Sequence, residues 1–154
     1  MGLDDFLQPD AIVPSLRAAT KKQALLELSD KAAQLTKLPA RAIFDALIQR
    51  ERLGSTGIGD GIAIPHGKLA RCEKILGVFA RLEKPIPFDA LDDAPVDLIF
   101  LLLAPEGAGA DHLSALSRAA RALREPGIVR TLRATRDASA IYSVLVNVAK
   151  PNAA

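Results

Sequence analysis

The sequence is poor in the residues that support disulfides, metal sites and imidazole chemistry. Of 154 residues, one is cysteine, none is tryptophan and two are histidine. The single Cys72 excludes an internal disulfide and a multi-cysteine metal site. No apolar run is long enough to span a bilayer, and the acidic start lacks the basic segment of a signal peptide. We therefore expect a cytoplasmic protein without membrane insertion, in which imidazole chemistry must use His66 or His112.

The composition that remains is typical of a globular protein. Hydrophobic residues make up 49% of the chain and charged residues 25%. A chain of this length can bury a core of its own, so we expect one domain over residues 1–154. The length and composition also exclude a disordered or collagen-like chain.

Apolar spacing predicts an alternation of helices and strands. The expected elements are a short extended segment at Ile12-Val13, helices over 21–36 and 39–53, strands over 62–64, 75–82 and 97–103, a helix capped by Asp111, and a short helix over 128–133. Residues 138–149 fit either a strand or a helix, and we predict a helix. The alternation indicates an α/β fold with one layered domain.

Positive charge gathers in the last third of the chain. Residues 112–150 carry seven basic and two acidic residues, which gives 7 − 2 = +5. Such a segment can be a set of solvated helix faces, or it can contact nucleic acid or an acidic protein. No aromatic residues interleave the arginines, which disfavours single-strand binding, so we expect no nucleic-acid partner.

A glycine-rich stretch over 54–68 resembles nucleotide-binding loops only superficially. A P-loop requires serine or threonine after its Gly-Lys pair, and Leu69 follows Lys68 here. A dinucleotide fingerprint based on Gly57 and Gly59 would require glycine at the position of Ile62. No two histidines share the spacing of a zinc-binding helix, so we expect neither a cofactor nor a metal.

His66 is the first candidate for chemistry. It lies between Pro65 and Gly67 at the end of a short apolar segment, which favours an exposed imidazole. A neutral imidazole is a nucleophile near pH 7 and can carry a phosphoryl group, although a structural histidine fits the same context. The neighbouring groups that could support phosphoryl oxygens are the Ser55 and Thr56 hydroxyls, the amides of Gly57 and Gly59, and the guanidinium of Arg50.

His112 is the second candidate. It follows the expected N-cap Asp111, and this places it in a first helical turn, where free N–H groups favour anions. It could therefore assist a phosphoryl group on His66, although a surface histidine is equally compatible with this position.

These residues together resemble a known family. The segment 57–68, Gly-Ile-Gly-Asp-Gly-Ile-Ala-Ile-Pro-His-Gly-Lys, resembles the phosphorylation motif of enzyme IIA domains of the bacterial phosphotransferase system, fructose/mannitol class, and most of all its nitrogen-related branch. Arg50-Glu51-Arg52, Phe88-Asp89-Ala90 and His112-Leu113 extend the resemblance. It implies a mixed sheet of about five strands with helices on both faces. It also implies that His66 accepts a phosphoryl group on Nε2 from a histidine phosphocarrier protein, with His112 beside it and Arg50 binding the group.

The nitrogen-related branch implies a regulator that changes its binding partners with its phosphorylation state. The partners implied by the resemblance are potassium-transport and sensor-kinase proteins. The alternatives are a sugar-specific IIA component that passes the group to a IIB domain, and a binding module in which His66 is not modified. Ser114 replaces a histidine that many members of this branch carry there.

Overall fold

The computed structural model describes residues 2–148. In chain order the elements are η1 (Leu3–Asp5), β1 (Leu7–Leu16), α1 (Lys21–Thr36), α2 (Ala40–Arg52), β2 (Gly57–Gly59), β3 (Ile62–Ala63), β4 (His66–Leu69), β5 (Leu76–Ile86), β6 (Val96–Pro105), α3 (Ala110–Ala122), α4 (Pro126–Ala134) and α5 (Ala138–Val148). None of the helices in this range has the length and hydropathy that crossing a bilayer requires.

The strands form one mixed sheet, which confirms the predicted α/β class. The order is β1-β5-β6-β3-β2, and β4 also pairs with β6. Strands β3 and β4 run one after the other along the same edge of β6, with Ile62 opposite Leu98 and His66 opposite Leu102. Pro65 separates them and has no N–H to give to the ladder. The sheet therefore has six strands in five positions, where about five strands were expected.

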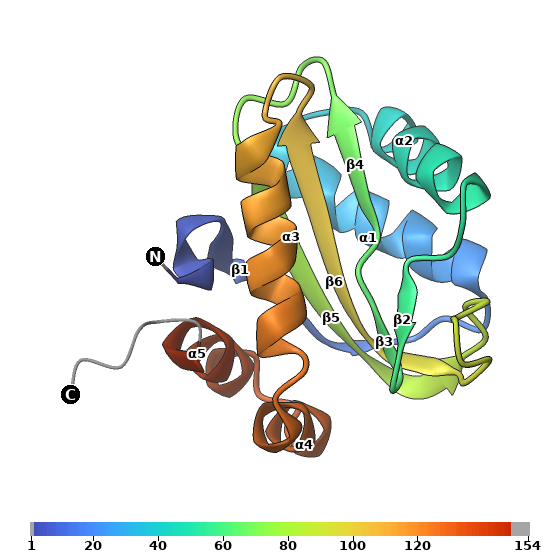
Figure 1. The fold of residues 1–154 in the computed structure, drawn as a ribbon, viewed down its shortest axis with the longest axis vertical. Coiled ribbons are helices and arrows are strands. Elements are labelled where there is room, and N and C mark those ends of the chain that lie inside the picture. Colours follow the sequence, from blue (N-terminus) through green and yellow to red (C-terminus); the bar gives the residue numbers. More distant parts are fainter. Residues whose placement is uncertain (1, 149–154) are drawn as a thin grey trace.

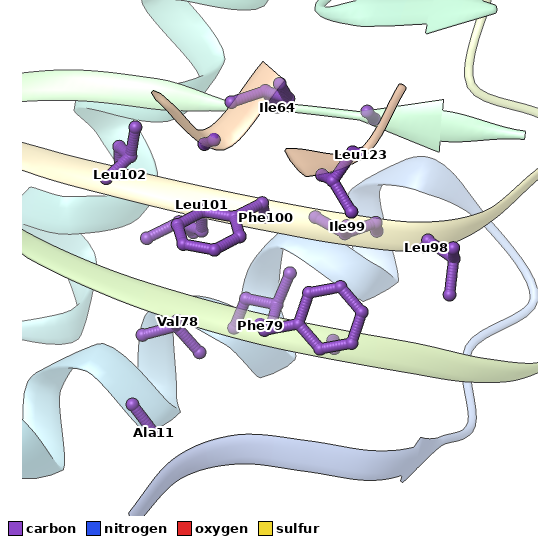
Figure 2. Packing of buried hydrophobic residues seen from close by; sticks show 14 of the residues in the cluster. Ala11, Ile64, Val78, Phe79, Leu98, Ile99, Phe100, Leu101, Leu102 and Leu123 are labelled. Atoms are coloured by element: carbon purple, nitrogen blue, oxygen red, sulfur yellow. The ribbon is translucent and has the colours of Figure 1, made fainter. Parts of the chain in front are cut away.

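Helices cover both faces of the sheet (Figure 1). Helix α3 crosses one face in front of β6, while α1 and α2 lie on the opposite side. Strand β6 is buried from both sides, since every residue over 98–104 has no exposed surface. Figure 2 shows Phe100 on β6 beside Phe79 on β5, and their ring centroids are 6.3 Å apart. This is the arrangement predicted from the continuous apolar run.

Two predicted helices are confirmed with their local signals. Helix α1 begins after Thr20, whose Oγ1 accepts the Gln23 N–H at 3.1 Å. The Gln23 side chain accepts the Ala19 N–H at 2.8 Å, which completes a capping box one residue earlier than its standard form. Residues 138–148 are helical as predicted, and residue 149 lies outside the described residues.

Proline and glycine positions account for the main corrections. Strand β1 is ten residues long, not two, because Pro9 and Pro14 are tolerated in a strand that pairs with β5 alone. Strand β5 likewise continues past Pro85, where its register with β6 is irregular. The predicted N-cap Asp111 is wrong, because Gly109 is the N-cap and its carbonyl accepts the Leu113 N–H.

Replacing the central aromatic side chain tests the core. Because Phe100 is fully buried between β5 and the packed helices, we expect Phe100→Ala to lower the free energy of unfolding by about 3–5 kcal/mol. Urea denaturation followed by circular dichroism measures this change. Leu91→Ala is the control, since Leu91 is 81% exposed and its loss should change stability by less than about 0.5 kcal/mol. Equal effects of the two substitutions would contradict the assigned core.

Candidate functional site

The two histidines of the chain meet in one open cavity. His66 begins β4 and His112 lies in the first turn of α3, and their ring centroids are 5.6 Å apart with the planes at 67°. Arg50 reaches the same cavity from the last turns of α2. The structure therefore brings together three residues that are separated by up to 62 positions in the sequence (112 − 50 = 62).

Hydrogen bonds fix the tautomer of His66. Its Nδ1 lies 2.9 Å from the carbonyl oxygen of Ile64, and a carbonyl can only accept, so Nδ1 carries the proton. Its Nε2 then has a free lone pair, and this accepts the Nε–H of Arg50 at 3.1 Å. The imidazole is consequently neutral and oriented, with Nε2 as its nucleophilic atom.

Arg50 is held in place from two directions. Its Nη1 donates to the carbonyl of Gly54 at 2.8 Å, which connects the guanidinium to the loop after α2. The helix itself lies close to β4 because Gly67 has no side chain, since a Cβ there would lie 3.2 Å from the Cβ of Ala46. The glycine beside His66 thus permits the short distance between α2 and the strand.

A chain of hydrogen bonds connects α2 to His66 through the glycine-rich segment. The Glu51 carboxylate, on a side chain only 5% exposed, accepts both the N–H and the hydroxyl of Thr56. The Thr56 carbonyl accepts the Ile64 N–H at 3.0 Å, and the Ile64 carbonyl accepts His66 Nδ1–H. Lys21 on α1 pairs with Glu51 at 2.8 Å and compensates its charge. The orientation of the imidazole therefore depends on a carboxylate that does not touch it.

The electrostatic environment favours neutral imidazoles. Burial lowers the pKa of His66 below its ordinary value of 6.5, and the charge of Arg50 lowers it further, while the Ile64 hydrogen bond and Glu51 oppose the shift. Burial also lowers the pKa of His112, and so do the neighbouring His66 ring and the positive charge of Lys68. Both shifts favour the neutral form of the imidazole over the imidazolium.

His112 contributes a buried polar atom to the cavity. The residue is only 5% exposed, and its Nε2 has no hydrogen-bond partner within residues 2–148. A buried unpartnered nitrogen is costly, which is typical of a site that receives a polar ligand. Within the same described range, no cluster of three or more histidine, cysteine or carboxylate side chains is arranged to hold a metal ion.

The predicted supporting residues of the glycine loop lie away from this cavity. The Ser55 hydroxyl donates to the Phe88 carbonyl at 2.7 Å and accepts the Gly57 N–H at 3.0 Å. Thr56 is bound to Glu51, as described above, and Gly59 pairs with β3 at a φ of 104°. None of the four lines the cavity of His66. Their hydrogen bonds shape the loop that aligns Arg50 and His66, and direct contact with a phosphoryl group stays a prediction.

Sequence reasoning predicted only Arg50, His66 and His112 among the ten residues that line the cavity, and three of the others bear on its function. Lys68 follows His66 by two positions on β4, so both side chains point to the same face of the strand. Leu53 and Leu113 are 84% and 69% exposed and lie on the rim. The two-residue spacing identifies Lys68 only once β4 is known to begin at His66. Large leucines at a helix end and in a first helical turn likewise give no signal before the elements are placed.

Comparisons with known proteins show similarity over most of the chain. The family described as phosphoenolpyruvate-dependent sugar phosphotransferase system, EIIA 2, matches residues 5–148. The chain is 61% identical over 145 residues to the nitrogen regulatory protein of Bradyrhizobium diazoefficiens, covering 94% of this chain and 95% of that one. A crystal structure of nitrogen regulatory protein IIA-Ntr from Neisseria meningitidis superposes with a TM-score of 0.88 at 36% identity, covering 92% and 97% of the two chains. The fructose-specific EIIA component of Haloferax volcanii is 38% identical over 131 residues, 84% of this chain and 85% of that one.

Removal of the arginine tests the electrostatic description of the site. We expect Arg50→Ala to raise the pKa of His66, because it removes a positive charge and opens the ring to water. A pH titration of the histidine ring nitrogens by NMR measures this pKa directly. Arg52→Ala is the matched control, since Arg52 is exposed near the end of the same helix. A pKa of His66 that stays unchanged or falls in Arg50→Ala would contradict the assigned contact.

Proposed function

The chain belongs to the EIIA 2 family of the phosphoenolpyruvate-dependent sugar phosphotransferase system, and from that premise we propose that it carries a phosphoryl group on Nε2 of His66. One observation supports this choice of atom above all. Nδ1 is committed to the Ile64 carbonyl, so Nε2 holds the lone pair that a covalent bond to phosphorus needs. The donor is a phosphorylated histidine of a carrier protein.

The transfer exchanges one nitrogen–phosphorus bond for another. The Nε2 lone pair of His66 forms a bond to phosphorus while the donor's N–P bond breaks, and that electron pair stays with the donor imidazole. Nδ1–H of His66 keeps its bond to Ile64 throughout, so the positive charge that develops on the ring faces a carbonyl oxygen. Little other chemistry is required, because positioning and charge stabilisation account for most of the catalysis in phosphoryl transfer.

Arg50 has two successive roles in this proposal. In the free protein its Nε–H occupies the Nε2 lone pair, so this hydrogen bond must break before phosphorus can approach. The guanidinium then pairs with the phosphoryl oxygens, for which its planar N–H groups are well suited. Lys68 adds a second positive charge from β4, and the unpartnered Nε2 of His112 lies beside the ring.

The rim of the cavity is suited to docking a carrier protein. Leu53 and Leu113 expose large apolar side chains and line the same cavity as the histidine pair. Apolar residues around a polar centre are typical of protein interfaces that exclude water from a reacting group. We expect the donor histidine to enter between these two leucines.

The biological output that fits best is regulation rather than sugar import. The relative with 61% identity is named a nitrogen regulatory protein, whereas the fructose-specific relative shares 38%. In this role the phosphorylation state of His66 changes which proteins bind, and the partners implied by the sequence resemblance are potassium-transport and sensor-kinase proteins. The second candidate is a sugar-specific IIA that passes the group to a IIB domain. Loss of uptake of one sugar alone, after deletion of the gene, would favour that second candidate.

Phosphoryl labelling tests the proposed acceptor. After incubation with the general phosphotransferase proteins and phosphoenolpyruvate, we expect acid-labile, base-stable phosphate on the wild-type protein. His66→Ala should carry none, and His112→Ala should be labelled about 10–100-fold more slowly because it loses only an assisting group. Cys72→Ser is the control for nonspecific effects of a substitution, since Cys72 does not line this cavity. Equal labelling of wild type and His66→Ala would disprove the proposal.

The initial rate of labelling should also depend on pH in a defined direction. Acceptance requires unprotonated Nε2, and the pKa of His66 is lowered from 6.5. The rate is therefore on its plateau at pH 7 and falls only at a pH below 6.5, as protons compete for the lone pair. Single-turnover transfer from the isolated phosphocarrier measures this, with carrier stability at each pH as the control. A rate that still rises with pH above 7 would show that a different group limits acceptance.

A further inference from the structure

The structure separates the arginines of the C-terminal third into paired and unpaired groups. Arg118 pairs with Asp5, Arg133 with Asp97 and Arg136 with Glu83. The remaining three, Arg121, Arg124 and Arg130, are exposed and have no ion pair within residues 2–148. The excess positive charge predicted from the sequence is thus concentrated at the end of α3 and on α4.

Two of these unpaired arginines border a groove. Arg124 and Arg130 line a depression between the α3–α4 corner and the β2–β3 hairpin. Its floor is apolar and is formed by Ile58, Ile62, Leu123, Pro126 and Val129. Ile58 is 37% exposed, so part of this apolar floor is in contact with water.

Hydrogen bonds from Arg133 connect the two walls of the groove. Arg133 on α4 donates from Nε to both oxygens of Asp97, at 3.1 and 2.9 Å, and from Nη2 to the Asp60 carbonyl at 2.6 Å. Asp60 lies in the turn between β2 and β3, so the hairpin is tied directly to α4. The groove is therefore formed without a ligand, which lowers the entropic cost of binding one.

The charges on the two walls have opposite signs. Arg124 and Arg130 make the helical wall basic, with Glu125 as the nearby acid, while Asp60 makes the hairpin wall acidic. A ligand with carboxylates along one side alone is favoured in one orientation and disfavoured in the reverse. A uniformly anionic polymer such as RNA would place negative charge against Asp60 and leave the apolar floor uncovered.

We propose that this groove docks an amphipathic helix of a partner protein, with apolar side chains on the floor and carboxylates facing Arg124 and Arg130. A helix that presents apolar residues at i, i+3, i+4 and i+7 offers one apolar face to this floor and a polar flank to the two arginines. The groove shares no lining residue with the cavity of His66. A partner can therefore be held there while the histidine remains open to the phosphocarrier.

A designed peptide tests the groove. The probe is a fluorescein-labelled amphipathic helix of about 18 residues, with leucines along one face and glutamates along one flank. We expect saturable binding by fluorescence anisotropy, and backbone NMR shift changes that concentrate on Ile58 and Val129. The double variant Arg124→Ala/Arg130→Ala should weaken binding at least about fivefold and reduce its salt dependence.

Matched controls separate this proposal from the phosphoryl-transfer function. Arg17→Ala/Arg71→Ala removes two other exposed arginines and should bind the peptide like wild type. The Arg124/Arg130 double variant should still accept phosphoryl groups at the wild-type rate. Binding that is absent at about 1 mM peptide, that is equal in the two double variants, or that maps to the cavity of His66 would overturn the proposal. So would tighter binding of a single-stranded RNA than of the peptide.

Discussion

The hydrogen bond from Arg50 Nε–H to His66 Nε2 is the interaction on which the site depends. It exists only because the opposite ring nitrogen, Nδ1, carries the proton and donates a hydrogen bond to the Ile64 carbonyl, which leaves the lone pair on Nε2. In the proposed transfer, the same bond covers Nε2 until the guanidinium turns to the phosphoryl oxygens. A half-buried, neutral imidazole with a fixed tautomer, held against a guanidinium, is thus the consequence of one local geometry.

The fold supplies that geometry through an interruption in the sheet. Pro65 lies between β3 and β4 and gives no N–H to β6, while its carbonyl still accepts the Leu102 N–H and keeps His66 in register with β6. Gly67 then lets α2 approach the strand closely enough for Arg50 to reach the ring. Glu51, one residue further along the same helix, anchors the loop whose carbonyl orients Ile64. Helix α2 therefore positions the Arg50 guanidinium and also, through Glu51, orients the imidazole ring of His66.

Much of this was readable in the sequence, and the exceptions have physical reasons. The apolar spacing of α1 and the apolar run of β6 reported local preferences that the fold retains. The length of β1 was underestimated, because an edge strand tolerates prolines that an inner strand would not. His66 and Arg50 were predicted, but Lys68 was not, since its role follows from alternation along a strand whose start was unknown. The Glu51 link was unpredictable because it joins segments through a tertiary hydrogen-bond chain.

The most direct test of the central claim is the state of the two ring nitrogens of His66, observed by nitrogen NMR before and after treatment with phosphoenolpyruvate and the general phosphotransferase proteins. The structure predicts a proton on Nδ1 and an unprotonated Nε2 in the free protein, followed by phosphorus bonded to Nε2 with the Nδ1 proton retained. A free protein with the proton on Nε2, or a phosphoryl group attached to Nδ1, would contradict this account.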